Sequence, residues 1–116
     1  MKIIRKNEAG RFENAGTCTA FEYETGGSDI NVARIEIRGR YPVEGNAINK
    51  AVRELVYVTE GSGVVSVNGI ESKLSQGDVV TIEKGEAVFW EGELTLVIAC
   101  TPAWTPEQYV IDASPI

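Results

Sequence analysis

The sequence contains no histidine in its 116 residues. Histidine is the commonest metal ligand in proteins and the side chain that ordinarily titrates nearest to neutral pH. Its absence excludes a histidine-based metal centre and a histidine general base. Acid–base chemistry near neutrality therefore falls to other groups, such as a carboxyl group whose pKa is raised by burial.

Basic residues are also few, because 11 Lys and Arg stand against 17 Asp and Glu and give a net charge of −6. A protein that grips phosphate groups of nucleic acid needs a basic stripe. None is present, so we expect neither nucleic acid nor a membrane as a partner. No apolar run approaches the roughly 20 residues of a membrane span, and residues 1–16 lack the apolar core of a secretory signal. We therefore expect a cytoplasmic protein.

Cysteine is scarce, and the two that occur, Cys18 and Cys100, lie in apolar, strand-like stretches. In a cytosolic protein such residues usually act as small buried hydrophobic side chains and form no disulfide. A reactive thiol stays open as the alternative.

Short alternating segments make up most of the chain. In residues 30–39, Ala33, Ile35 and Ile37 alternate with charged residues, which is typical of a strand with one buried face. Residues 54–59 are apolar on both faces, which indicates a strand packed on both sides. We expect further strands over residues 3–5, 18–24, 64–67, 70–75, 79–83, 87–91, 94–101 and 109–111.

Turn signals separate these segments. Asn68-Gly69 predicts a two-residue type I′ hairpin turn, because both residues tolerate a positive φ. We interpret Gly61 and Gly92 as turns between strands and residues 40–52 as a loop. Several short strands without a long helix predict a sandwich or barrel.

One short helical turn is expected near the C-terminus. Thr105 is a candidate N-cap, Pro106 follows at the first helical position, and Gln108 stands at the third. This order is typical of a capping box.

Two segments of the chain are anchored by glycines: Glu54 precedes Gly61 by seven residues, and Gly77 precedes Gly85 by eight. These segments resemble the conserved motifs of the cupin superfamily. The resemblance implies an all-β, cupin-type double-stranded β-helix (jelly-roll) barrel in a single domain, 1–116. Within it we expect N-terminal strands over 1–29, a cupin core over 30–111 and a tail over 112–116.

Cupins usually hold a divalent metal with three histidines and one glutamate. Glu54 matches the glutamate here, but other residues occupy the histidine positions. Two of these fall on Ile48 and Lys50, or on Ala47 and Asn49, and the third falls on Val88. Glu54 alone, even helped by Asn49, would bind a transition metal poorly. We therefore expect no metal and no cofactor.

A pocket can persist without the metal. If Val88 takes the inward position of the missing ligand, strand alternation also directs Trp90 inward. We expect the ligand-binding residues to be Asn49, Glu54, Val88 and Trp90. An amide, a carboxylate and an indole over an apolar floor suit a neutral or cationic small molecule, such as a sugar.

Each of these residues also has a structural interpretation. Glu54 could pair with Lys50 or Arg53, Trp90 could belong to the core, and Asn49 could cap a loop.

Three functions follow from this pattern. The first is a metal-free module that binds a small, sugar-like molecule in the barrel. The second is a metal-independent isomerase, epimerase or lyase that uses Glu54 as its general base. The third is a structural barrel with no ligand. The resemblance also implies a homodimer.

Overall fold

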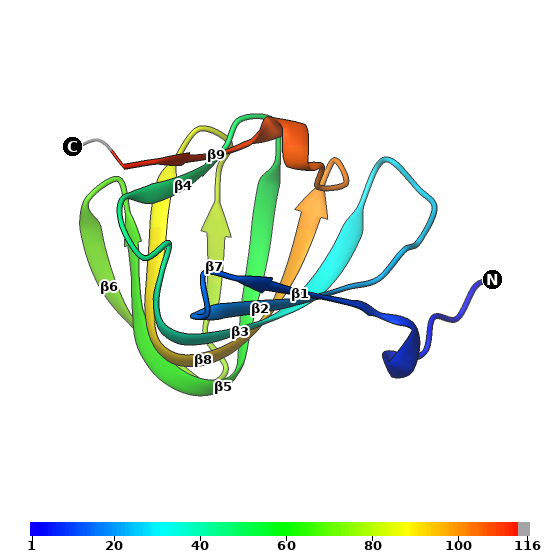
Figure 1. Ribbon diagram of the computed structural model, residues 1–116, viewed down its shortest axis with the longest axis horizontal. Helices are drawn as coiled ribbons and strands as arrows, with labels where there is room; N and C mark the ends of the chain where they lie inside the picture. The colour runs from blue at the N-terminus through cyan, green and yellow to red at the C-terminus, as the bar shows by residue number, and fades with distance from the viewer. Residues whose placement is uncertain (114–116) are drawn as a thin grey trace.

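The computed structural model describes residues 1–113, in which nine strands curl into a barrel (Figure 1). The strands are β1 (Gly10–Asn14), β2 (Cys18–Glu22), β3 (Asn31–Tyr41), β4 (Asn46–Asn49), β5 (Arg53–Val67), β6 (Ile70–Ser75), β7 (Val79–Ile82), β8 (Ala87–Thr101) and β9 (Tyr109–Asp112). Two short 3₁₀ turns, η1 (Lys6–Glu8) and η2 (Pro106–Gln108), complete the described elements. The expected all-β cupin barrel is confirmed. Residues 114–116 of the expected tail lie outside the described residues.

Strand β8 organises the sheet. It pairs antiparallel with β3 on one side and with β5 on the other, and its first residues also pair with β4. The resulting order is β1-β2-β3-β8-β4-β9, and β5 connects β8 to β6 and β7. Both 15-residue strands, β5 and β8, curve strongly (Figure 1), so each contributes to two faces of the barrel.

The barrel interior holds the hydrophobic core. Alternation along β3 places Ile37 inward, where it is fully buried, and Ile35 packs against the same cluster, as the sequence predicts. Other fully buried side chains come from β5 and β8: Val56, Val58, Leu94 and Leu96. Each contributes about 1.5–3 kcal/mol through burial.

The hairpin turn at Asn68-Gly69 is confirmed. Both residues have positive φ, 50° and 82°, and Val67 pairs directly with Ile70.

Gly61 and Gly92, however, do not end strands, and their interpretation as turns is wrong. They lie inside β5 and β8 with φ of 86° and 131°, and the register between these strands shifts at Val58/Glu60. The glycines let two long strands bulge and bend rather than stop.

Two further predictions, both for the N-terminal half of the chain, are wrong. Residues 3–5 form no strand, and the chain first joins the sheet at β1. The expected loop over 40–52 contains β4, which pairs with β8 and β9. Its sequence, Asn-Ala-Ile-Asn, lacks a run of β-branched residues, so this strand depends on its distant partners.

The prediction that residues 54–59 are packed on both sides is wrong for the single chain. Val56 and Val58 are fully buried, but Leu55 is 50% exposed and Tyr57 48% exposed on the opposite face. Nothing in residues 1–113 covers that face.

Residues 1–113 contain no helix that is long and apolar enough to cross a bilayer.

Candidate functional site

A cavity of about 1030 Å³ lies inside the barrel and extends under its N-terminal strands. Side chains from seven strands line it, together with residues of the loops 23–28 and 103–106. A volume of this size is ample for a small metabolite. Its aromatic lining residues are Phe12, Tyr23, Tyr41, Trp90, Trp104 and Tyr109.

All four ligand-binding residues expected from the sequence line this cavity: Asn49, Glu54, Val88 and Trp90. Asn49 comes from β4, Glu54 from β5 and the other two from β8. Glu54 makes no ion pair with Arg53, whose guanidinium instead contacts Glu83 at 2.9 Å. Trp90 is both a core residue and a cavity residue. Its side chain is 7% exposed and belongs to the core cluster, and it also borders the cavity.

Glu54 is the titratable group at the centre of the site. Burial removes its carboxyl group from water and raises its pKa to about 7. Hydrogen bonds from Asn49 and from the thiol of Cys100 oppose this rise without cancelling it. The Cys100 Sγ lies 3.9 Å from Glu54 Oε2. A carboxyl group with this pKa exchanges its proton readily at neutral pH.

The side chain of Asn49 is held in one orientation. Its Oδ1 accepts hydrogen bonds from Gln108 Nε2 at 2.7 Å and from Trp104 Nε1 at 3.0 Å. The Nδ2 group is the only donor of the Asn49 side chain, so it is the group that lowers the pKa of Glu54. The C-terminal segment therefore positions the amide that contacts the central carboxylate.

Gln108 helps to orient Asn49 and does not form the predicted capping box. The 3₁₀ turn begins at Pro106 as expected, but Thr105 makes no side-chain cap. Gln108 is buried, and its Oε1 accepts the backbone N–H of Ala51 at 3.1 Å. The capping prediction is wrong because Gln108 Nε2 donates to the Thr105 carbonyl oxygen and to Asn49 Oδ1, and its Oε1 does not accept the Thr105 N–H.

A pair of tyrosines forms a second polar feature of the lining. The hydroxyl oxygens of Tyr41 and Tyr109 lie 3.1 Å apart. Burial raises the pKa of both phenols, so both are protonated at neutral pH. One hydroxyl donates to the other, which leaves the second O–H free to donate to a ligand. Tyr109 also packs edge-on against Trp104, with ring centroids 5.4 Å apart.

The two cysteines are buried and unpaired, as expected. Burial raises the pKa of Cys18 to about 11 and that of Cys100 to about 12, the latter helped by the neighbouring Glu54. Both thiols therefore stay protonated at neutral pH, which disfavours the reactive-thiol alternative.

The residues present do not fit the transition metal that cupins usually hold. Ala47 and Val88, which stand at positions of the missing histidines, line the cavity with Glu54 and supply no donor that binds such a metal well. No group of three His, Cys, Asp or Glu residues within 1–113 could hold an ion.

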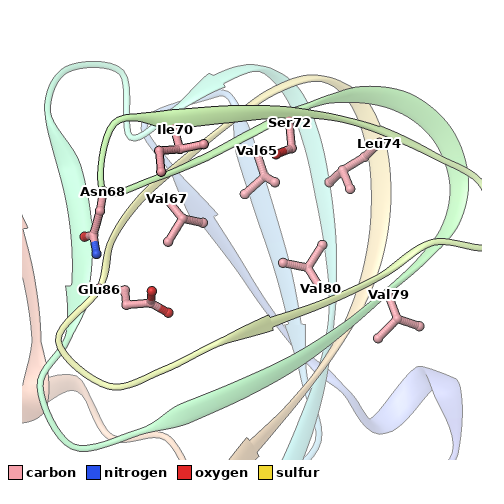
Figure 2. A pocket seen from close by; sticks show the side chains of 9 residues that line it. All are labelled: Val65, Val67, Asn68, Ile70, Ser72, Leu74, Val79, Val80 and Glu86. Atoms are coloured by element: carbon pink, nitrogen blue, oxygen red, sulfur yellow. The ribbon is translucent and has the colours of Figure 1, made fainter.

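A second, smaller hollow of about 440 Å³ lies between β6 and β7 (Figure 2). Val65, Val67 and Val80 project into it. Its polar side chains serve nearby turns, because Asn68 Oδ1 accepts the Ala87 N–H and Glu86 Oε1 accepts the Glu83 N–H. This hollow therefore offers a ligand little beyond apolar contact.

Replacing Gln108 by leucine tests the network around Asn49. The change leaves the Ala51 N–H without its acceptor and removes one donor from Asn49. We expect the free energy of unfolding, measured in urea, to fall by about 1–3 kcal/mol. Glu107→Leu, at the exposed neighbouring position, is the control and should change stability by less than about 0.5 kcal/mol. Equal losses in the two variants would contradict this assignment.

The fold and the site define a cupin barrel with an open internal cavity and no histidine ligands. Residues 40–98 match the EutQ-like cupin domain family, and the chain belongs to this family. No curated protein matches the sequence.

Solved structures share the fold at low sequence identity. Pac13 from Streptomyces, described as a nucleoside dehydratase, is 18% identical with a TM-score of 0.88, over 97% of this chain and 92% of its own. An ectoine synthase from P. lautus is 17% identical with a TM-score of 0.74, over 100% of this chain and 93% of its own. KdgF from Halomonas sp. is 14% identical with a TM-score of 0.73, over 92% and 97%.

Proposed function

We propose that this protein binds a small, hydroxyl-bearing molecule in the barrel cavity. The observation that carries the proposal is the cavity of about 1030 Å³, in which Glu54, Asn49 and two tyrosine hydroxyls face aromatic side chains. Tryptophan and tyrosine rings offer flat apolar surfaces to a sugar-like ring, and the polar groups can pair with its hydroxyls. A purely structural barrel would fill this space with side chains, because protein interiors are close-packed.

The shared fold supports this proposal in one respect. Pac13 has been observed in complex with uridine, a nucleoside that carries a hydroxylated sugar. A barrel of this shape can therefore accommodate a molecule of that size and polarity. The identity of the ligand here depends on this chain's own lining, which has no histidine.

Native mass spectrometry of the protein mixed with a small-molecule extract of its source cells tests the proposal. We expect one organic mass to remain bound to the wild type. Ala33 lines the cavity and Ala99 does not, so Ala33→Phe should lose the bound mass and Ala99→Phe should keep it. No bound mass in the wild type, or one retained by Ala33→Phe, would contradict binding in the cavity.

A second function, proton transfer on the bound molecule, is favoured by the pKa of Glu54 at about 7. Glu54 would act as the general base of a metal-independent isomerase, epimerase or lyase. General acid–base catalysis of this kind contributes roughly 10²–10⁴-fold to a rate.

The test follows conversion, or exchange of solvent deuterium into the bound molecule, in wild-type protein and in Glu54→Gln. We expect Glu54→Gln, saturated with the ligand, to react about 100-fold more slowly. Equal rates, or no reaction in the wild type, would leave Glu54 a binding group only.

A further inference from the structure

The charged side chains that line the cavity are all of one sign. They are four carboxylates: Glu8, Glu22, Glu24 and Glu54. None of the chain's 11 Lys and Arg, all of which lie within residues 1–113, lines the space. Four of the arginines pair with glutamates outside the cavity instead: Arg11, Arg34, Arg38 and Arg53.

These carboxylates reach the cavity from different parts of the chain. Glu8 ends η1, Glu22 ends β2 and Glu24 follows it, and Glu54 lies near the start of β5. One carboxylate oxygen of Glu8 already has a hydrogen-bond partner, because Oε1 accepts the backbone N–H of Arg5 at 3.2 Å. One lysine, Lys2, approaches the loop that follows Glu24, where its Nζ lies 3.6 Å from the position that a Cβ on Gly26 would take.

Glu22 and Glu54 act on the same region of the lining. Cys100 donates to Glu54, and its thiol pKa is raised first by burial and then by the charges of Glu54 and Glu22. Glu22 is exposed at the end of β2, and partial desolvation together with the charge of Glu24 raises its pKa. The cavity therefore concentrates negative charge that no described side chain inside it neutralises.

Aromatic rings surround this charge. Trp90, Trp104, Tyr41 and Tyr109 line the cavity together with Glu54. The face of an aromatic ring is electron-rich and attracts an organic cation, most strongly in the case of tryptophan. Glu54 is largely buried among these rings, whereas Glu8, Glu22 and Glu24 line the solvent-exposed part of the cavity. Carboxylates and aromatic faces along one cavity favour the same kind of ligand. They repel an anion, so phosphorylated and carboxylated molecules fit poorly.

We infer that the cavity ligand carries a positive charge, as a protonated amine or a quaternary ammonium group held among Glu54, Glu22 and the aromatic side chains. This inference rests on the proposed binding function and adds the charge of the ligand to it. A hydroxyl-bearing amine would use the whole lining, because its hydroxyls can pair with Asn49 and the tyrosine hydroxyls.

Intrinsic fluorescence can test the inference, because both tryptophans of the chain, Trp90 and Trp104, line the cavity. The probes are choline and the dimethylbutanol in which carbon replaces its ammonium nitrogen, titrated separately at mildly alkaline pH. The two probes match in shape and differ in charge. We expect choline to bind at least about tenfold more tightly than the alcohol.

Single substitutions test which carboxylates make choline bind more tightly than the alcohol. Glu54→Gln and Glu22→Gln should each bring the two affinities closer together, whereas Glu71→Gln, on the exposed part of β6, should leave their ratio unchanged.

The outcomes separate the inference from the proposed function. Equal affinities, or tighter binding of the alcohol, would overturn the positive charge and leave small-molecule binding intact. No response to either probe, or an undiminished response in Ala33→Phe, would contradict both.

Discussion

Glu54→Gln should make the protein more stable than the wild type at alkaline pH and remove part of the pH dependence of its stability. Burial raises the pKa of Glu54 from 4.5 to about 7 in the folded state, so the folded protein holds this proton more tightly than the unfolded chain does. The contribution to stability is therefore fully present below about pH 4.5 and is lost as the pH rises through about 7. The loss amounts to about 3 kcal/mol at about pH 8.

Urea unfolding of both proteins at several pH values measures this effect. The difference in free energy of unfolding, Glu54→Gln minus wild type, should grow by about 3 kcal/mol between about pH 4.5 and about pH 8. Other carboxyl groups titrate in both proteins and cancel in the difference. Glu71→Gln, at an exposed position on β6, should show no such trend. A constant difference across the range would mean that Glu54 titrates at its ordinary pKa.

Gly61→Ala should be among the most destabilising single substitutions in the chain. Gly61 has a φ of 86°, and a Cβ there would overlap the backbone carbonyl group of Glu93 on the paired strand β8. Neither β5 nor β8 can move away, because they pair along almost their whole length through the barrel wall. We expect a loss of more than about 3 kcal/mol, or failure to fold.

Gly77→Ala is the matched control. Gly77 also has a positive φ, 93°, but a Cβ there would meet nothing within 4 Å. Its expected cost is about 1 kcal/mol, from the backbone conformation alone. Gly63→Ala isolates the other cause, because a Cβ there would overlap the Glu91 carbonyl oxygen although Gly63 has no positive φ. Similar losses in urea for Gly61→Ala and Gly77→Ala would show that close strand approach is unimportant.

The family motifs were informative because their glycines report backbone geometry. Gly77 and Gly85 have positive φ without crowding, as turn glycines do, and the spacing around them predicts the barrel correctly. Gly61 and Gly92 carry the same local signal but lie within strands. A glycine shows that the backbone is unusual, and only the partner strand decides whether the chain turns or bulges there.

The inward residues of the site could also be predicted. Strand alternation from Val88 leads to Trp90, and both border the cavity together with Glu54 and Asn49. The rest of the lining had no comparable signal. Trp104, Gln108 and Tyr109 meet Asn49 and Tyr41 across 55 to 68 residues of sequence. The N-terminal carboxylates reach the cavity only because β1 and β2 extend the sheet beside β3.

A carboxyl carbon NMR titration of Glu54, assigned by comparison with Glu54→Gln, tests the central claim most directly. If Glu54 is a buried acid inside an open cavity, its signal will shift with a midpoint near pH 7, and a cationic probe such as choline will lower that midpoint. A midpoint near 4.5, unchanged by the probe, would show a solvated carboxylate. That result would contradict the site described for this barrel.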